Sequence, residues 1–328
     1  MGAPSLSVIV PVRDGGAAFE VCLKALSRST YRDFELVVVD DGSHDSSAEA
    51  ARRQDATVLT TRGGEGPAAA RNLGVAAASA ETLLFLDADC EVHEETLDLL
   101  VEALTDEKLV AVFGSYDDEP KAEGTVSRFR NLLHHFVHQA SHPEIETFWA
   151  GCGAVRKHAF LAVGGFDAEK YRRPSIEDID LGYRLTDAGG RIAVRPEILV
   201  RHHKRWTFVA MVVTDVRDRG IPWTALLLRR GSRSRDLNLS TRGRLGIFLA
   251  AAFFASLPVA AAWPPALAAS GVSAAGLVIL NRDFYRFLLG KGGLGFATVS
   301  VALHAVHLAS SAAAYVAGGI RHFARHLT

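Results

Sequence analysis

Residues 34–43 read FELVVVDDGS, an apolar run that ends in two acids, a glycine and a serine. Such an uninterrupted run of Leu and Val is typical of a strand that is buried on both faces. Residues 82–89, TLLFLDAD, repeat the pattern, with Asp87 and Asp89 after the apolar run. Because ligands of open parallel sheets bind at the carboxyl ends of the strands, we expect both acidic turns to face one crevice.

The same alternation continues to about Pro196, where short runs of Val, Ile, Leu and Phe separate helical stretches rich in Ala, Glu and Arg. This pattern predicts an α/β domain with a mostly parallel sheet covered by helices. A chain of 328 residues exceeds the usual size of one core, so a second module is expected. The predicted strands are Ser7–Pro11, Glu35–Asp40, Thr57–Thr60, Thr82–Asp87 and Val110–Ser115, with others near Ala150–Val155 and Arg191–Val194.

The overall composition limits the partners and the compartment. The 36 basic and 37 acidic residues nearly balance, so there is no electrostatic reason to expect a nucleic-acid partner. Cys22, Cys90 and Cys152 are far apart and odd in number, which favours a reducing compartment over a disulfide framework. Residues 7–11, SVIVP, look like a first strand rather than a signal peptide, so we expect the catalytic part to be cytoplasmic.

The second half of the chain changes character, because no charged residue occurs between Arg244 and Arg282. One helix over this stretch would be about 55 Å long, roughly twice the hydrocarbon thickness of a bilayer. Trp263-Pro264-Pro265 interrupts it, which predicts two helices joined at the prolines. A further apolar run, Leu294–Ile320, is broken only by two histidines, so the sequence predicts about three membrane spans.

Basic residues flank these runs, and the positive-inside rule places both groups in the cytoplasm. The tail of Arg321, His322 and Arg325 would then lie outside, so the third span either does not cross fully or violates the rule. The first group is Arg229, Arg230, Arg233, Arg235, Arg242 and Arg244, and the second is Arg282, Arg286 and Lys291.

Two alternatives to this membrane interpretation stay open. Ala-rich apolar helices also occur in buried helical domains of soluble proteins. The stretch Trp206–Arg230 mixes large apolar side chains with acids and arginines, which suits helices lying in the membrane interface. An amphipathic linker packed on the catalytic domain would show the same mixture.

Several polar motifs suit the chemistry of a sugar diphosphate. Asp87 and Asp89 are hard oxygen ligands that could hold Mg²⁺ or Mn²⁺, although such a turn can also be a solvated cap. Asp40 and Asp41 could accept a base N–H or a ribose hydroxyl, or could serve only as a turn and helix cap. Arg71, at a helix start, suits a phosphate contact, with an ordinary surface helix position as the alternative.

An acidic cluster at residues 177–180 supplies a candidate for proton transfer. Glu177, Asp178 and Asp180 open a helix, whose N-terminal dipole stabilises carboxylates. One of them could then be deprotonated at neutral pH, as a general base must be. The alternative is an acidic cap that pairs with Arg184.

Together, in order, the stretches SVIVPVRDGG, FELVVVDDGSHDSS, GPAAARNLGVAAA, LLFLDADC, FWAGCGAVRKHAFLAVGGFD and IEDIDLGYRLTDAG resemble glycosyltransferase family 2. The resemblance covers about Ser5 to Trp206. It implies an inverting enzyme with a GT-A nucleotide-sugar-binding (Rossmann-like) domain, here followed by a C-terminal helical transmembrane region. The expected domains are residues 1–205 for catalysis, 206–243 for an interfacial basic linker and 244–328 for the membrane region.

The resemblance also implies roles for individual residues. Asp40 and Asp41 would bind the nucleoside base, and Asp87 and Asp89 would handle ribose, diphosphate and metal. Asp178 would be the catalytic base, supported by Glu177. The nucleotide-sugar site would further include Pro11, Asp14, Arg71, Ala88 and Gly151.

Residues 202–206, HHKRW, resemble the Gln-x-x-Arg-Trp motif of the processive synthases in this family, with His202 in place of Gln. Arg205 would contact the diphosphate, and Trp206 would lie near the acceptor. His202, preferred only slightly over His203, could be a third metal ligand beside Asp87 and Asp89, or a solvated or phosphate-facing side chain. Arg13-Asp14 also departs from the family pattern, which leaves the nucleotide open.

The function expected from these features is transfer of a single sugar, with inversion, from a nucleotide-diphosphate sugar. The acceptor would be a lipid, a lipid-linked molecule or another membrane-proximal molecule, and the cofactor Mg²⁺ or Mn²⁺. We expect a multi-pass protein of the inner (cell) membrane, in contact with membrane lipids, with its catalytic domain cytoplasmic. The alternatives are a processive polysaccharide synthase and a non-catalytic membrane scaffold that binds nucleotide sugars.

Overall fold

The structure, a computed structural model, describes residues 4–231 and 239–324. Arg233, Arg235 and Arg325 of the predicted basic groups lie outside the described residues. The chain divides into two compact units. The first comprises the residues up to Ala122 together with His138–Lys204, and the second comprises Glu123–Val137 and the chain from Arg205 onward.

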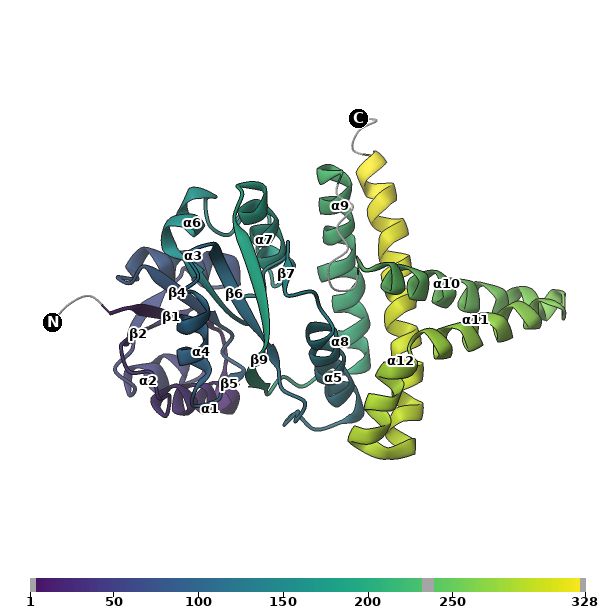
Figure 1. Cartoon of the computed structure of the whole chain (residues 1–328), viewed down its shortest axis with the longest axis horizontal. Helices are drawn as coiled ribbons and strands as arrows, with labels where there is room; N and C mark the ends of the chain where they lie inside the picture. Colours follow the sequence, from purple (N-terminus) through teal and green to yellow (C-terminus); the bar gives the residue numbers. More distant parts are fainter. Residues whose placement is uncertain (1–3, 232–238, 325–328) are drawn as a thin grey trace. The chain divides into compact units, whose positions relative to one another are not determined.

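The first unit is built on one sheet with the strand order β3-β2-β1-β4-β8-β6-β9-β5, and β7 pairs with β9 (Figure 1). The pairs β1–β2, β2–β3, β1–β4 and β6–β9 are parallel, whereas β8 runs antiparallel to both β4 and β6. The predicted parallel sheet is therefore a mixed one. Its strands are β1 (Leu6–Val12), β2 (Phe34–Asp40), β3 (Thr57–Thr60), β4 (Thr82–Leu86), β5 (Cys90–Val92), β6 (Leu109–Tyr116), β7 (Glu144–Ile145), β8 (Cys152–Arg156) and β9 (Arg191–His202).

Helices cover this sheet, and the apolar strands between them are almost fully buried. α3 begins with a proline in its first turn, directly after Gly66 at φ 89°, which is the usual way in which proline opens a helix. α7 carries three acids in its first turn, where the helix dipole favours negative charge. The helices of this unit are α1 (Gly16–Ser27), α2 (Ser47–Arg52), α3 (Pro67–Ala77), α4 (Thr96–Ala103), α6 (Lys157–Ala162) and α7 (Glu177–Asp187).

The second unit is helical. Its largest cluster of buried side chains joins α5 to α8 and α12, with Phe129, Leu132, Met211, Phe284 and Leu288 at its centre. The helices are α5 (Thr125–Gln139), most of which belongs here, α8 (Phe208–Val213), the π-helix η1 (Thr214–Gly220), α9 (Ile221–Arg230), α10 (Thr241–Ala262), α11 (Ala266–Leu280) and α12 (Arg282–Ala324).

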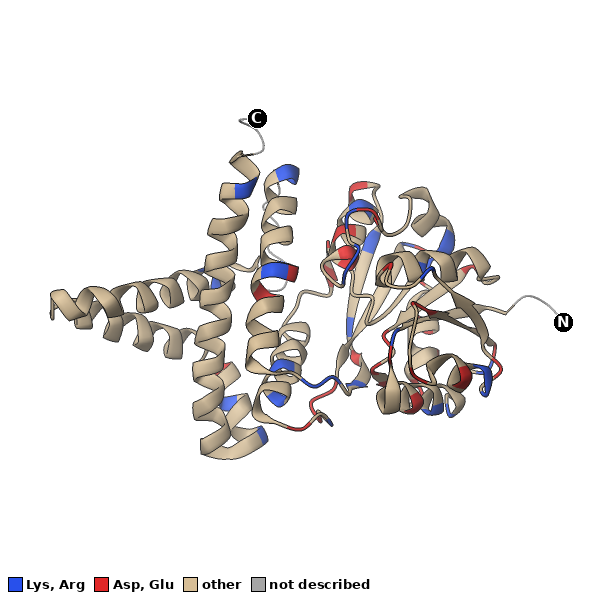
Figure 2. Cartoon of the chain, turned by 180° about the vertical axis from the view of Figure 1, so that it is seen from behind, with Lys and Arg blue, Asp and Glu red and all other residues tan. Residues whose placement is uncertain are grey.

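The apolar stretch forms two helices, α10 and α11, that meet at Trp263-Pro264-Pro265, as predicted. α12 changes direction at Gly293, which has φ 71° (Figure 1). Among the described residues, α10 and α12 are long and apolar enough to cross a membrane, judged by length and composition, whereas α11 has only 15 residues. The structure thus supports two candidate crossings rather than the three predicted. Charged residues are sparse on the α10–α11 hairpin (Figure 2).

Candidate active site

A buried arginine ties three elements of the first unit together. Arg71 on α3 donates to Asp87 after β4, at 2.7 Å, and to Glu177 at the start of α7, at 3.0 Å. The Arg71 and Glu177 side chains are each only 6% exposed. Burial lowers the pKa of the guanidinium, but the charges of Asp87 and Glu177 outweigh burial and raise it. Arg71 is therefore a permanent cation that holds two acidic motifs together.

A backbone turn brings Asp178 to the same place. The N–H of Ala150 donates to the Asp178 carboxylate at 3.2 Å, and the carbonyl of the next residue, Gly151, accepts from the N–H of Asp87 at 3.1 Å. Asp178 also accepts the N–H of Ile179 at 2.8 Å. The predicted residues Asp87, Gly151, Asp178 and Glu177 thus lie together, although they are up to 91 positions apart in the chain (178 − 87 = 91).

The side chain of Asp89 faces a histidine at the end of β9. His202, the last residue of β9, has its Nε2 atom 3.6 Å from a carboxylate oxygen of Asp89. β5, which follows Asp89, pairs with β9 so that Cys90 lies opposite His202, and His203 N–H donates to the Asp89 carbonyl at 2.9 Å. The His202 ring stacks on Tyr116, with centroids 4.1 Å apart. The β5–β9 ladder therefore fixes the distance between Asp89 and His202.

The charge state of Asp89 follows from these neighbours. Burial raises its pKa, but the hydrogen bond and charge of His202, together with the charge of Lys204, outweigh burial and hold the pKa at about 2. Asp89 is therefore ionised at neutral pH and is suited to a cation. Neither Tyr116 nor Lys204 was a predicted site residue: Tyr116 ends an ordinary apolar strand, and Lys204 was only one basic residue in the motif after β9.

A carboxylate and an imidazole that face each other are a donor set that suits Mn²⁺, and Mg²⁺ through the carboxylate. Asp89 and His202 therefore fit a divalent cation. Arg71 binds one oxygen of the Asp87 carboxylate, and the role of Asp87 as a metal ligand stays a prediction. Among the described residues, no group of three or more His, Cys, Asp or Glu side chains could hold a metal ion. The remaining ligands would have to come from water and from the phosphates of a substrate.

The turn after β2 is held mainly by its own hydrogen bonds. Asp40 accepts from Ser43 N–H at 2.8 Å. Asp41 accepts from Thr61 Oγ1, Glu65 N–H and Gly66 N–H, so its carboxylate organises the loop that leads into α3. Both aspartates are buried, at the carboxyl edge of the parallel strands.

The other predicted residues at this edge lie after β1. Pro11 is in β1, opposite Val39 of β2, and is half-buried. Asp14 has φ 51° and accepts the N–H of His44 at 2.6 Å, so it joins the β1 turn to the β2 turn. Ala88 lies between the two aspartates after β4.

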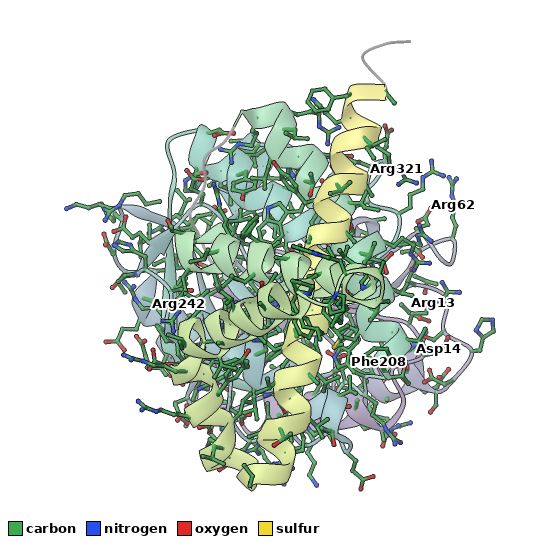
Figure 3. The ribbon with its side chains drawn as sticks, turned by 90° about the vertical axis from the view of Figure 1, so that its right-hand side faces the viewer. Arg13, Asp14, Arg62, Phe208, Arg242 and Arg321 are labelled. Carbon is green, nitrogen blue, oxygen red and sulfur yellow. The ribbon has the colours of Figure 1, made fainter. Side chains whose placement is uncertain are left out.

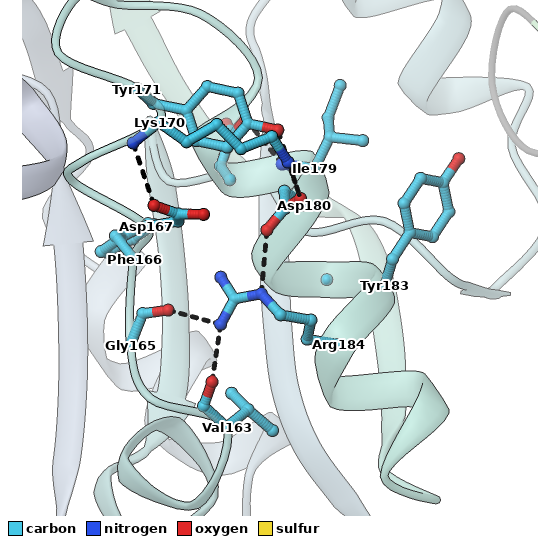
Figure 4. A network of polar contacts seen from close by, with 12 residues as sticks. Val163, Gly165, Phe166, Asp167, Lys170, Tyr171, Ile179, Asp180, Tyr183 and Arg184 are labelled. Atoms are coloured by element: carbon cyan, nitrogen blue, oxygen red, sulfur yellow. Dashed lines mark hydrogen bonds and ion pairs between the residues drawn. The ribbon is translucent and has the colours of Figure 1, made fainter. Parts of the chain in front are cut away.

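A second ion network, separate from the Arg71 contacts, holds α7 in place (Figure 4). Asp180 accepts from Lys170 and from Arg184, each at 2.8 Å. Arg184 also donates to the carbonyls of Val163 and Gly165 at 2.7 and 2.6 Å. The network binds loop 163–171 to α7 at Asp180 and Arg184, two and six residues after Asp178. Asp180 therefore makes the pair with Arg184 that the sequence left open for the whole acidic cluster.

The two residues of the Arg-Trp pair belong to the second unit. Arg205 is exposed. Trp206 donates its N–H to Ser127 Oγ at 2.9 Å, and the guanidinium of Arg130 lies over its ring at 5.2 Å. Ser127 and Arg130 both belong to α5.

Residues 7–164 match the family model of glycosyl transferase family 2, and this range contains the β1, β2 and β4 turns described above. The matched residues make up a little under half of the chain. The chain is 30% identical over 210 residues to the pre-mycofactocin glycosyltransferase of Mycobacterium tuberculosis, a match that covers 61% of this chain and 43% of that protein. It is 28% identical over 161 residues to glycosyltransferase GlyG of Streptococcus pneumoniae, covering 48% and 54%. The chain spans about half the length of these relatives.

Solved structures show the same fold around the family 2 domain. A mannosyltransferase from Pyrobaculum calidifontis, in complex with GDP-Man and Mn²⁺, aligns with a TM-score of 0.61 at 19% identity over 96% of this chain and 88% of that chain. Residues 1–349 of S. aureus TarS align with a TM-score of 0.51 at 16% identity, over 95% and 90%. The predicted fold class, a GT-A-like α/β domain followed by a helical region, is confirmed.

Proposed function

We propose that this chain is a glycosyltransferase that moves a single sugar from a nucleotide-diphosphate sugar to an acceptor at a membrane. The observation that carries the proposal is the convergence of Asp87 and Asp178 on the turn at Ala150-Gly151, where Arg71 joins Asp87 to Glu177. The family 2 domain and the glycosyltransferase relatives support it.

Asp178 acts as the general base. It removes the proton of the acceptor hydroxyl, whose oxygen attacks the anomeric carbon while the nucleoside diphosphate leaves on the opposite side, so the configuration inverts. Glu177 supports Asp178 indirectly, because its buried pair with Arg71 fixes the first turn of α7. The hydrogen bond from Ala150 keeps one oxygen of Asp178 oriented.

Asp89 and His202 would hold Mg²⁺ or Mn²⁺, and such an ion would supply positive charge for the departing diphosphate. That the mannosyltransferase of P. calidifontis was solved with GDP-Man and Mn²⁺ supports both a nucleotide-sugar donor and a divalent cation. Asp87, fixed by Arg71, lies beside this pair for the ribose and the diphosphate. The role of Arg205 at the diphosphate and that of Trp206 at the acceptor stay predictions.

The carboxyl edge of β1 and β2 receives the nucleoside. Asp40 is the direct contact there, and Asp41 acts by shaping the loop from Thr61 to Gly66. Pro11 and Asp14 form the opposite side of the same turn, and Ala88 and Gly151 complete the proposed nucleotide-sugar site.

The acceptor is a lipid or lipid-linked molecule, reached from the cytoplasmic face of the inner (cell) membrane. The two long apolar helices α10 and α12 support membrane attachment. A processive synthase would need a polymer channel, and the sparse set of candidate spans speaks against one. Product length separates single transfer from processive synthesis.

The test uses the purified full chain with divalent metal and a panel of labelled nucleotide sugars, followed by lipid extraction. Asp178→Asn and Asp89→Ala should each lower turnover by about 10²-fold or more. Asp187→Asn, at the exposed end of the same helix α7, is the matched control and should keep full activity. Wild-type turnover in Asp178→Asn would remove that residue from the mechanism. A chain that binds nucleotide sugars but neither transfers nor hydrolyses them would instead be a scaffold.

A further inference from the structure

The α10–α11 hairpin buries hydroxyl side chains and exposes large apolar ones, which is the reverse of the usual pattern in a soluble protein. Its hydroxyl groups point inward: Ser270 and Ser273 are buried, and Ser256 Oγ lies 2.7 Å from Ser270 Oγ. Its large apolar side chains point outward, with Val272 71% and Ile279 68% exposed. This arrangement is stable in hydrocarbon, where polar groups must find partners inside the protein.

The base of the hairpin is closed by an arginine. Arg242 donates through Nε to the Leu280 carbonyl at 2.7 Å, and its guanidinium lies 3.2 Å from Asp283. The tip carries the exposed Trp263. Since α10 is about 33 Å long, its tip reaches about as far as the hydrocarbon layer is thick. Both ends therefore leave the bilayer on the same side, beside a polar base that suits phosphate head groups.

α12 differs from the hairpin, because ionised side chains lie beside the middle of this helix. Asp215 of η1 lies 2.9 Å from Arg130 of α5 and accepts a hydrogen bond from His307 of α12 at 2.7 Å. Burial raises the pKa of Asp215, but His307 and Arg130 outweigh burial and hold it at about 2. A charged cluster thus lies midway along the segment of α12 that follows Gly293.

α12 is also packed closely against η1 and α9, so the three helices must be placed together. A Cβ atom added to Gly220 would lie 2.4 Å from the Cβ of Ala314, and one added to Gly318 would lie 2.7 Å from the Cβ of Thr224. The helices therefore touch through their backbones at two points. If α12 crossed the bilayer, η1 would cross with it, and Arg217, whose side chain is 56% exposed, would be placed in hydrocarbon.

The two candidate spans also point in different directions. Within the second unit, the α10–α11 hairpin runs crosswise to α12 and projects away from it (Figure 1), and the view along the hairpin shows α12 passing behind it (Figure 3). Helices arranged in this way do not both cross one bilayer. The hairpin carries no charged residue from Leu245 to Leu280, so the hairpin is the part that enters the bilayer.

We propose that the hairpin alone enters the bilayer, while α8, η1, α9 and α12 lie along the membrane face with apolar side chains in the head-group region. Exposed apolar side chains on these helices suit the head-group region, and η1 and α9 add the basic residues Arg217, Arg219, Arg229 and Arg230. The exposed apolar side chains are Phe208, Val209, Leu294, Val299, Tyr315, Val316, Ile320 and Phe323. The basic tail at Arg321 and His322 then stays on the cytoplasmic side, in agreement with the positive-inside rule.

The inference rests on the membrane attachment proposed above but not on sugar transfer, and cysteine labelling tests it. The native cysteines are all buried, so single cysteines at exposed positions can be labelled selectively with a membrane-impermeant maleimide. The variants are Lys108→Cys in the catalytic unit as reference, Trp263→Cys at the hairpin tip and Arg321→Cys near the end of α12. Each is measured in inside-out vesicles and in spheroplasts.

We expect Arg321→Cys to be labelled on the same side as Lys108→Cys, and Trp263→Cys not to be labelled from that side. Labelling of Arg321→Cys only from the opposite side would show that α12 crosses and would overturn the inference. Labelling of Trp263→Cys from the Lys108 side would overturn hairpin insertion. Proteolysis of a C-terminal tag on the otherwise native chain, in the same two preparations, gives the α12 result without a substitution in the helix. Recovery of the chain in the soluble fraction would contradict membrane attachment itself.

Discussion

Arg71 is the residue on which the position of two acidic motifs depends. Its guanidinium bonds Asp87 and Glu177 in a fork that a lysine cannot reproduce. Removing the cation leaves the buried Glu177 and the partly exposed Asp87 without their positively charged partner, which costs about 3 to 5 kcal/mol. Arg71→Met should therefore lower the unfolding temperature of the detergent-solubilised protein by several degrees, and Arg71→Lys should retain part of the stability.

Measuring turnover as well as stability distinguishes a role of Arg71 in orienting the acids from a role in the stability of the whole protein. We expect Arg71→Lys to lose turnover more than it loses stability, because one ammonium group cannot orient Asp87 and Glu177 together. Arg52→Met, on the exposed end of α2, is the control. Full turnover in a stable Arg71→Lys protein would mean that the fork has no part in positioning the acids.

His202 allows a metal-specific prediction. Removing its imidazole leaves Asp89 as the remaining candidate ligand, so His202→Ala should require about tenfold or more Mn²⁺ for half-maximal activity. His202→Gln keeps a polar ligand atom and should need less added metal than His202→Ala. Titrating Mn²⁺ against activity measures both, and identical curves for wild type and His202→Ala would exclude His202 as a ligand.

Residue types in sequence identified the acidic motifs, but not how each carboxylate is used. Asp41 and Asp87 belong to equivalent turns after parallel strands, yet Asp41 is occupied by Thr61 and two backbone N–H groups, and Asp87 by Arg71. Those partners come from loops and helices that the local sequence does not specify. Tyr116 gives no signal at all, because an aromatic residue in a strand ordinarily packs in the core.

At the scale of elements, periodicity was sufficient for the long strands and insufficient for the short ones. The strands predicted near residues 7, 35, 57, 82, 110, 150 and 191 are all present. β5 and β7, with three and two residues, are too short to show an alternating pattern. β5 nevertheless sets the distance between Asp89 and His202 through its pairing with β9. The strand pair that matters most for the site is therefore one that the sequence pattern could not predict.

The network on α7 makes that helix sensitive to acid. Burial raises the pKa of Asp180, but Lys170 and Arg184 outweigh burial and lower it. A carboxyl group whose folded pKa is depressed adds stability above its unfolded pKa, and that stability is lost as the pH falls through the folded value. Asp180→Asn should therefore lose on the order of 2 kcal/mol at pH 7.

The unfolding temperatures of wild type and Asp180→Asn should then converge as the pH falls below about 4, the usual pKa of an aspartate. Thermal melts across a pH series measure this. A difference that stayed constant from pH 7 to pH 3 would show that the carboxylate charge of Asp180 does not contribute.

At the scale of the whole molecule, the boundary between the two units is not a single point in the sequence. In the sequence, α5 falls between β6 and β7 of the catalytic unit. In the structure, Phe129 and Leu132 of α5 are buried against side chains of α8 and α12. Composition could not reveal this, because α5 has the amphipathic pattern of any helix that covers a sheet.

Truncation gives a direct test at this scale. A chain that ends at residue 205 exposes the apolar face of α5, so we expect it to aggregate in size-exclusion chromatography. The same fragment with Phe129→Ser and Leu132→Ser should elute as a smaller species. A monodisperse, folded fragment without those substitutions would show that α5 does not depend on the second unit.

The placement of α5 also constrains how such proteins can be recombined. A chimera that exchanges only the C-terminal tail after Lys204 would give the new tail a docking helix selected for a different partner. A functional exchange has to transplant residues 123–137 together with the tail, as one discontinuous cassette. The helical second unit of this chain therefore depends on a short segment that lies between the two sequence segments of the first unit.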